Sequence, residues 1–254
     1  MSITIQMSDR LDKKTLIIND RLDFVNNFLG SISKVVDDCI IKIKENKLVC
    51  LSSTSDGTLI QLVQHKCKNK FEQVLNIPDV KRLHKIINCI ESPVVELKVD
   101  NNSVSYNSNE TRFKFHLLDD GILSETAISV EKIKKIEYDC EFDLSFDKLT
   151  DLVKGSTFSN ESEKLYLYTD EGGNMYGELT DREKPNMDSF SIKLVDNIKI
   201  NLLPIAFNFE NIRIISSTRG DSLKIKINTT LNVMRVDIVR NDSYISYIVS
   251  GLVK

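Results

Sequence analysis

The sequence predicts an α+β fold in which antiparallel sheet dominates and a few amphipathic helices pack against it. Most of the 254-residue chain alternates apolar and polar residues between short turn-forming segments, which is the pattern of half-buried antiparallel strands. Only three stretches follow the helical period instead, and two of them hold corresponding places in a repeated order of elements. These observations together favour a duplicated, sheet-rich protein.

The strands are clearest in three segments. The segment "VVELKVDNNSVSYNSNETRFKF" (94–115) predicts strand, Asn-rich turn, strand, turn and strand. Residues 165–181 predict a hairpin around Gly172 and Gly173, and residues 212–251 predict three or four further strands. Antiparallel hairpins therefore account for most of the chain.

The three helical stretches share one spacing of apolar residues, at i, i+3, i+6, i+7 and i+10. The stripes are Leu22, Val25, Phe28, Leu29 and Ile32; Val80, Leu83, Ile86, Ile87 and Ile90; and, for the first four members only, Phe146, Leu149, Leu152 and Val153. In the second stretch three cations, Lys81, Arg82 and Lys85, lie opposite the stripe. Such a basic face is either ordinary solvated surface or a surface directed at phosphate.

Nearly constant offsets indicate an internal duplication. Three positions in the first half each have a counterpart roughly 125 residues later: Leu22 with Phe146, Ile40 with Leu165, and Pro78 with Pro204. We therefore divide the chain into a first domain (1–121), a charged connector (122–137) and a second domain (138–254). In the second copy the helix after Pro204 is expected to be short or absent, because its apolar residues keep no clean stripe.

Composition limits the kinds of protein that this chain can be. Its net charge is −3, so the chain as a whole would not attract nucleic acid, and DNA contact would require local clusters of cations. The five cysteines are widely spaced and form no C-x-x-C pair, which argues against a disulfide framework or a zinc site and for a reducing compartment. Without an apolar leader or a run that could cross a bilayer, we expect a cytoplasmic protein that does not enter membranes.

Residues for catalysis are not apparent in the sequence. The three histidines (65, 84 and 116) lie in separate predicted elements, with no cysteine or carboxylate at a ligand or triad spacing. The nine glycines form none of the usual phosphate-binding motifs. We therefore expect no metal, no cofactor and no enzyme activity, with a site assembled from distant residues as the alternative.

The duplicated order of helix, hairpins, second helix and final sheet resembles the sliding DNA clamps. The nearer likeness is to the trimeric clamps of tailed bacteriophages, and proliferating cell nuclear antigen (PCNA) is more distant. The resemblance rests on residues 28–58, on "TRFKFHLLDDGILSE" (111–125) and on "FDLSFDKLTDLVKG" (142–155), and it covers nearly the whole chain from about residue 15. It implies the DNA-clamp fold: two duplicated domains of antiparallel sheet, with helices lining the inside of a ring.

The resemblance also implies a function. Such clamps encircle duplex DNA without sequence preference, are placed on it by a clamp loader, and tether the replicative DNA polymerase as processivity factors. The cations implied to face DNA are Lys34, Lys81, Arg82, Lys85, Lys148 and Lys154. For each of them ordinary surface charge is the alternative, and for Lys148 and Lys154 the neighbouring Asp147 and Asp151 would weaken a positive field.

Two kinds of protein contact follow from the same resemblance. A homotrimeric ring would close by pairing residues 111–117 of one subunit with residues 174–181 of the next. Partner proteins would insert an apolar peptide into a pocket beneath the connector. The residues implied to line this pocket are Ile122, Leu123, Ile128, Pro204, Ile205, Leu252 and Val253, although ordinary packing between domains would use the same residue types.

One rival to the clamp is a non-enzymatic viral structural or interaction protein with a β-sandwich core, in which the basic helix is only surface. It differs from the clamp in forming no ring. An enzyme with a dispersed site is the second rival, and it would lose turnover when a clustered acid or histidine is replaced.

Overall fold

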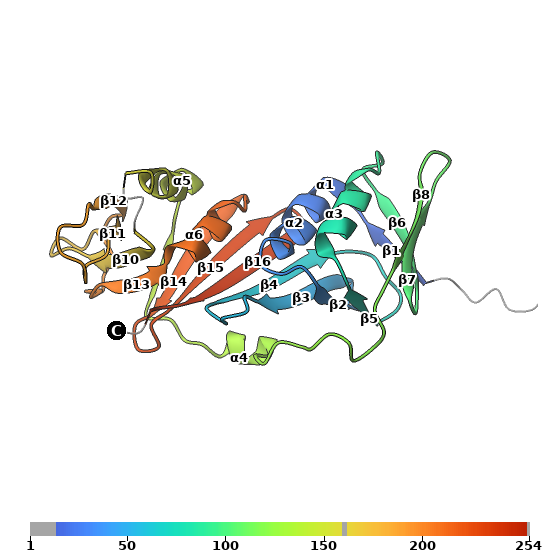
Figure 1. Ribbon diagram of the computed structural model, residues 1–254, viewed down its shortest axis with the longest axis horizontal. Coiled ribbons are helices and arrows are strands. Elements are labelled where there is room, and N and C mark those ends of the chain that lie inside the picture. The colour runs from blue at the N-terminus through green and yellow to red at the C-terminus, as the bar shows by residue number, and fades with distance from the viewer. Residues whose placement is uncertain (1–13, 159–161, 253–254) are drawn as a thin grey trace, which may run out of the picture.

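The computed structural model describes residues 14–158 and 162–252 (Figure 1). The first half begins with strand β1 (Lys14–Ile18) and a helical layer formed by α1 (Arg21–Asp23), the π-helix η1 (Phe24–Leu29) and α2 (Gly30–Ile32). It continues with β2 (Cys39–Lys44), β3 (Lys47–Ser53), β4 (Leu59–Lys66), β5 (Gln73–Ile77), α3 (Val80–Asn88), β6 (Val95–Asp100), β7 (Ser103–Asn107) and β8 (Arg112–His116).

The second half repeats this order after a connecting segment that contains the short helix α4 (Val130–Lys134). Its elements are β9 (Cys140–Asp143), α5 (Phe146–Gly155), β10 (Lys164–Thr169), β11 (Met175–Leu179), β12 (Phe190–Val195), β13 (Ile205–Asn208), α6 (Phe209–Ser216), β14 (Ser222–Asn228), β15 (Val233–Arg240) and β16 (Ser243–Ser250). Each half thus contributes one strand, one helical layer, four strands, one helix and three strands. The α+β fold of two duplicated, sheet-rich domains is confirmed.

Three antiparallel sheets are built from these strands. One four-stranded sheet has the order β1-β6-β7-β8, and another has the order β12-β11-β10-β13. The central sheet has eight strands in the order β5-β2-β3-β4-β16-β15-β14-β9, so four come from each half. In the repeated order of elements β4 corresponds to β12, and β16 corresponds to β8.

The two halves join where β4 pairs with β16, and we call this pairing the seam. Its register runs from His65 opposite Ser243 to Leu59 opposite Val249. Because the ladder is continuous, the backbone groups of both strands are satisfied across the boundary between the halves. The chain is therefore one continuous sheet structure across its middle.

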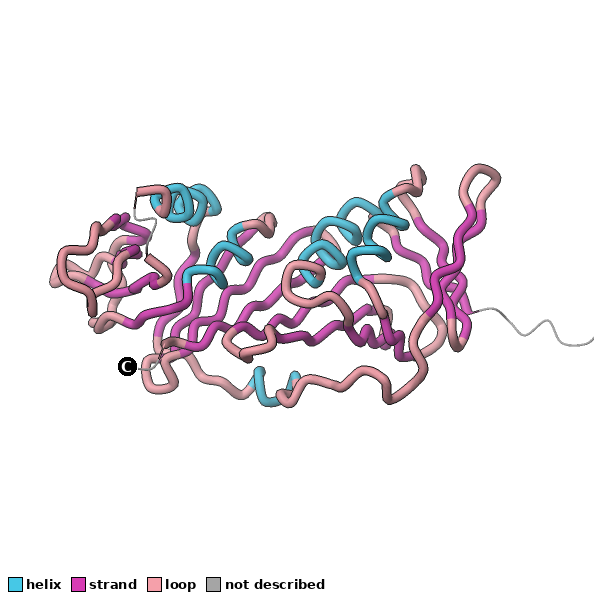
Figure 2. Tube along the Cα trace, viewed as in Figure 1, coloured by secondary structure: helices cyan, strands magenta, loops and turns pink. Residues whose placement is uncertain are grey.

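All the helices except α4 lie on one side of the central sheet, and the connecting segment with α4 crosses the other (Figures 1 and 2). We call these the helix side and the connector side. Each longer helix begins at a side chain that accepts a backbone N–H: Asp79 for α3, Ser145 for α5 and Asn208 for α6. Their apolar residues face the sheet, as Val80, Leu83 and Ile87 of α3 illustrate, since all three are buried.

The first helical layer differs from the predicted stripe. Val25, Phe28, Leu29 and Ile32 are buried, but Leu22 is 56% exposed. The π-helix over Phe24–Leu29 adds residues to the turn, and this shifts the face that Leu22 would have shared. Phe24 is buried instead, and its ring stacks on that of Phe28 at 5.3 Å.

The helix of the second half that we expected to be short or absent is present as α6, which has eight residues. Pro204 does not begin this helix, because it precedes β13. It is therefore not the structural counterpart of Pro78, which lies between β5 and α3. Because the sequence suggests Pro204 as the start of the helix, α6 is not recognised from the sequence. Its N-cap is Asn208, and its buried face includes Phe209, Ile212 and Ile215.

The prediction that residues 174–181 form the edge strand that pairs with another subunit is also wrong. Residues 174–181 contain β11, and β11 pairs on one side with β10 and on the other with β12. A strand paired on both sides has no free ladder for another subunit. The outer strands of that sheet are β12 and β13, and those of the first sheet are β1 and β8. Bridges from Ile17 to Lys68 and from Phe207 to Gly251 partly cover β1 and β13, so among the described residues β12 and β8 are the free edges.

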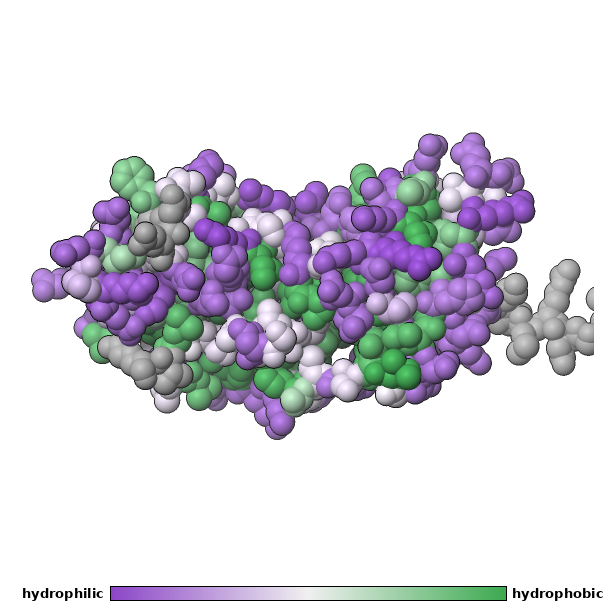
Figure 3. Space-filling model, viewed as in Figure 1, coloured by the Kyte–Doolittle hydropathy of each residue, from purple (hydrophilic) through white to green (hydrophobic). Residues whose placement is uncertain are grey.

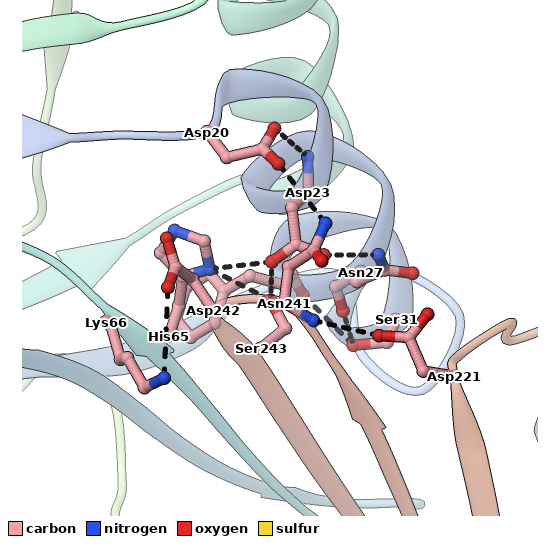
Figure 4. A network of polar contacts seen from close by, with 11 residues as sticks. Asp20, Asp23, Asn27, Ser31, His65, Lys66, Asp221, Asn241, Asp242 and Ser243 are labelled. Carbon is pink, nitrogen blue, oxygen red and sulfur yellow. Dashed lines mark hydrogen bonds and ion pairs between the residues drawn. The ribbon is translucent and has the colours of Figure 1, made fainter.

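A buried polar network ties the helix layer to the seam (Figure 4). Ser243 donates to Asp23 Oδ2 at 2.7 Å, and Asn27 Nδ2 donates to Asp23 Oδ1 at 2.6 Å. His65 Nδ1 lies 2.8 Å from Ser243 Oγ and 3.4 Å from Asp23 Oδ2. Because the Ser243 hydroxyl donates to the carboxylate, its oxygen accepts from His65 Nδ1–H, which assigns a proton to Nδ1 of this ring.

These three side chains share the composition of a Ser-His-Asp triad but not its geometry. In a triad the serine contacts one ring nitrogen of the histidine and the carboxylate contacts the other. Here Ser243 and Asp23 both contact Nδ1 of His65, and all three side chains are buried. The arrangement is suited to joining α1, β4 and β16.

We expect Asp23→Asn to lower the free energy of unfolding by about 1–3 kcal/mol at pH 7, because a buried acceptor of three side-chain groups is replaced. Burial alone would raise the pKa of Asp23, but the hydrogen bonds from His65, Asn27 and Ser243 together lower it. The contribution of a carboxylate with a lowered pKa is present above its ordinary pKa and is lost as the pH falls through the folded-state value. The difference between the two proteins should therefore shrink below about pH 4.

Urea unfolding at neutral and acidic pH measures this difference. Asp37→Asn is the matched control, because Asp37 lies on the same side of the sheet with an exposed side chain, and such a change should shift stability by no more than about 0.5 kcal/mol. Equal, small losses in both variants would show that the network does not stabilise the seam.

Candidate nucleic-acid interface

The strongest group of cations on the helix side belongs to α3. Lys81, Arg82 and Lys85 are all exposed, opposite the buried stripe of this helix. Lys81 Nζ lies 2.7 Å from Asp37 Oδ1, and this hydrogen bond raises the pKa of Lys81. The Arg82 guanidinium lies 6.0 Å from the centre of the Phe115 ring. The sequence prediction of one apolar and one basic face therefore holds for this helix.

His84 lies on α3 between these cations and the core. Its side chain is half-buried, and its ring is about 4 Å from where a side chain on Gly30 would begin. Burial lowers the pKa of His84, and the charges of Lys34 and Lys85 lower it further. This imidazole is therefore neutral at neutral pH and contributes a polar contact without charge.

The cations of α5 are placed less favourably. Lys148 is half-buried, and Lys154 is exposed with its Nζ 3.7 Å from Asp151 Oδ1. Exposed pairs of this kind are weak, so Asp151 reduces the local positive field without fixing the lysine. Ordinary surface charge therefore stays the alternative to a DNA contact for Lys148 and Lys154, as the sequence indicated.

Lys34 makes a contact within the chain. Its Nζ donates to the backbone carbonyl of Ser217 at 2.9 Å. Ser217 caps the carboxyl end of α6, where a cation is favourable because several carbonyl groups point outward. Lys34 of the first half therefore helps to hold α6 of the second half.

Two arginines on the helix side were not among the predicted residues. Arg213 lies on α6, pairs with Glu210, and stacks over Phe209 at 4.8 Å. Arg219 follows α6 and donates to Thr150 Oγ1 of α5 at 3.1 Å. Both were missed because the apolar residues of this region keep no clean helical stripe in the sequence. The described cations on the helix side thus come from both halves of the chain.

The helix side as a whole is polar and mixed in charge. In Figure 3 the side chains along the upper rim, where the helices lie, are mainly hydrophilic, and this outline dips between the two ends. The cations alternate with carboxylates such as Asp37, Asp151 and Glu210. A surface of this composition can contact phosphates at several points without strong overall attraction.

The residues predicted for a partner pocket fall into two groups. Leu123 and Ile128 line a groove of about 900 Å³ between the connecting segment and strands β2–β4, while Ile122 is exposed and does not line it. Pro204, Ile205 and Leu252 lie together elsewhere, around β13, where the Leu252 N–H donates to the Ala206 carbonyl at 2.8 Å. Val253 lies outside the described residues.

One residue of the connecting segment is far more buried than its neighbours. Ile133 of α4 is 1% exposed and packs on Ile60 of β4 and Ile248 of β16, directly over the seam. The weak periodicity of the segment concealed this anchor, because a helix of five residues gives little repeating signal.

The described part of the chain contains neither a group of metal ligands nor a helix that could span a membrane. No group of three or more His, Cys, Asp or Glu side chains there is arranged to hold a metal ion. Within the same residues, none of the helices combines the length and apolar character needed to cross a bilayer.

Solved structures provide the comparison with known proteins. No family model matches this sequence, and a search of curated proteins found no match. The A. fulgidus PCNA, in a structure with the C-terminal region of FEN-1 bound, superposes with a TM-score of 0.74 at 16% identity, over 95% of this chain and 99% of that one.

Two further clamps are similar to this chain. PCNA from Entamoeba histolytica gives a TM-score of 0.76 at 10% identity, over 95% of this chain and 99% of that one. The H. pylori β clamp gives 0.75 at 14% identity, over 97% of this chain and 68% of that one. At these identities the likeness concerns the fold alone, and the chain has the fold of the sliding DNA clamps.

Proposed function

We propose that this protein is a sliding clamp: a homotrimeric ring that encircles duplex DNA without sequence preference and tethers a replicative DNA polymerase as its processivity factor. Its role is that of a scaffold rather than an enzyme. The observation that carries the proposal is the pair of free strand edges, β8 and β12, at positions that correspond to the two strands of the seam.

The internal repeat supports ring closure. Within the chain β4 pairs with β16, and the counterparts of these strands in the other halves are β12 and β8. The same antiparallel pairing, made between β12 of one copy and β8 of the next, would continue the sheet from subunit to subunit. A head-to-tail contact of this kind forms a ring if its rotation closes. Three copies are the number that the resemblance to two-domain clamps implies.

The two sides of the sheet would then have separate tasks. The helix side would line the hole and contact phosphates through Lys81, Arg82 and Lys85, with Arg213 and Arg219 in the second half. Such contacts carry no sequence information and can be individually weak. Retention would come from the closed ring, which cannot leave a duplex sideways.

The connector side would receive partners. One similar structure is a PCNA with a region of FEN-1 bound, and a groove lies beneath the connecting segment here. We place a polymerase and an ATP-driven clamp loader among the partners, and we retain the division into domains 1–121 and 138–254 with a connector at 122–137. We assign the protein to the tailed-phage branch, acting in the host cytoplasm.

Native mass and topology test this function together. Light scattering over a concentration series should give about three times the 29.0 kDa of one chain. Once loaded, the protein should remain on a closed circular plasmid and be lost when a single cut makes the plasmid linear, because a ring slides off an end. A monomer at every concentration, or equal retention on both DNAs, would exclude the clamp and favour a simple interaction protein.

The subunit junction can be tested by Lys114→Pro. Hydrogen bonds from Ser108 N to Thr111 O and from Leu117 N to Asn102 O fix the register of β8 on β7. In that register the N–H of Lys114 points away from β7 to the free edge, because bonded and non-bonded pairs alternate. Proline there removes an edge donor without removing a bond to β7.

We expect Lys114→Pro to reduce the native mass to that of one chain with an unchanged circular-dichroism spectrum. Lys114→Ala keeps the N–H and should keep the trimer. If the proline variant is still trimeric, β8 does not form the junction.

The DNA-facing surface can be tested with the triple change Lys81→Ala, Arg82→Ala and Lys85→Ala. We expect weaker DNA association with the native mass unchanged, because the three cations belong to α3 and their replacement leaves the backbone donors and acceptors of β8 and β12 in place. The slope of log affinity against log salt should become less steep by up to about three, roughly one for each lost phosphate contact.

The matched control for this triple change removes the same charge from the connector side, with Lys132→Ala, Lys134→Ala and Lys135→Ala. This variant should bind DNA with the wild-type salt slope. Equal slopes in wild-type protein and the α3 variant would contradict the assignment of α3 to DNA.

A further inference from the structure

The groove on the connector side has an apolar floor. Its strands contribute Ile40, Val49 and Leu51, which are half-buried, and Leu62, which is buried. The connecting segment forms the opposite wall with residues 123–131, Ile133 and Lys134. Apolar surface is visible along the lower part of the molecule in Figure 3, near the connecting segment. The floor can therefore accept an apolar side chain from another molecule.

The connecting segment is fixed at two points of very different chemistry. Glu125 Oε1 lies 2.7 Å from Lys42 Nζ on β2, and Ile133 is buried on Ile60 and Ile248. Between these points Ile128 is 37% exposed. The connecting segment itself therefore binds this face of the sheet through a carboxylate, that of Glu125, and an aliphatic side chain, that of Ile133.

Three lysines lie side by side at one end of the groove. Lys44 of β2 is opposite Lys47 of β3, and Lys47 is opposite Lys66 of β4. Lys44 and Lys47 line the groove. Lys66 lies on the same face of β4 as Leu62 and Gln64, which also line the groove, because residues two apart in a strand share a face. Like charges directly opposite one another are destabilising, so the row is a local cost to the fold.

Carboxylates near the row do not neutralise it fully. Lys66 Nζ is 3.9 Å from Asp242 Oδ1, and within the described residues no ion pair joins Lys44 or Lys47 to an acid. Three acids besides Glu125 also line the groove: Asp38, Glu45 in the hairpin turn between these two lysines, and Glu131 of α4. The charged groups that β2 and β3 themselves contribute to the groove are all lysines, Lys42, Lys44 and Lys47, and they lie beside its apolar floor.

We propose that this groove binds an acidic segment of a partner protein that also carries an aliphatic or aromatic side chain. The apolar side chain would lie on Val49 and Leu62, and the carboxylates would pair with Lys44 and Lys47. The inference rests on the proposed function, since it specifies which partner segments the clamp would recruit. A polyphosphate fits less well, because it has no apolar group for the floor. Its continuous negative charge would also extend beyond the lysines to the carboxylates of Asp38, Glu45, Glu125 and Glu131, which line the groove too.

The test uses short labelled peptides and fluorescence anisotropy. One peptide has a central Phe-Leu pair flanked by aspartates, and the other has asparagine in place of each aspartate. We expect wild-type protein to bind the acidic peptide about tenfold more tightly, as two partly exposed ion pairs allow, with the preference falling as salt rises. Equal affinities for the two peptides would overturn the proposal.

The double change Lys44→Glu and Lys47→Glu should remove the preference for the acidic peptide, and Lys44→Gln with Lys47→Gln should reduce it while disturbing the hairpin less. Lys98→Glu is the matched control, since it reverses an exposed strand lysine of β6, in another sheet, and it should bind like wild type. A preference that persists in both row variants would also overturn the proposal. Competition by a DNA oligonucleotide equal to that by the acidic peptide would show a nucleic-acid site instead.

Native mass and retention on circular DNA, measured in the same variants, separate this inference from the proposed function. Both properties should be unchanged in the row variants. A trimeric, DNA-retained protein without peptide preference would reject only the groove assignment. A monomeric wild-type protein would reject the clamp whatever the peptides do.

Discussion

The pairing of β4 with β16 is the constraint on which the rest of the structure depends. It joins two groups of four strands, one from each half, and without it β4 and β16 would each be an open edge. The pairing extends from Leu59 to His65 of β4. Open edges are a hazard unless they are paired or covered. The seam satisfies one pair of edges within the chain, while the corresponding edges of the repeat, β8 and β12, stay free.

Contacts on both sides of the sheet reinforce this seam. On the helix side the Asp23, His65 and Ser243 network links α1 to both strands, and Lys34 reaches the end of α6. On the connector side Ile133 covers the same junction. The buried network uses directional bonds and the isoleucine uses apolar contact, so the relative position of the halves is fixed by both types of interaction.

The sequence was informative where a pattern is local and repeated. Alternation led to the sheet-rich α+β fold and the stripe of α3 to one basic face, since burial on one side imposes those periods. The nearly constant offsets between the halves led to the duplication. It misled where tertiary context decides: the π-helix exposed Leu22, and Pro204 lies before a strand although its neighbours suggested a helix start. The lysine row was invisible, because only strand register brings Lys44, Lys47 and Lys66 together.

The mixed charge of the helix side has a physical logic if the protein is a clamp. Lys81 with Asp37 and Lys154 with Asp151 form exposed pairs that are weak and easily exchanged. A phosphate that approaches such a pair gains a contact and displaces a carboxylate, so the net attraction stays small and the protein is not held at one place on the DNA. A ring that gains its retention from closure needs no stronger attraction than this. The acidic carboxylates among the cations therefore favour movement, whereas a uniformly basic face would oppose it.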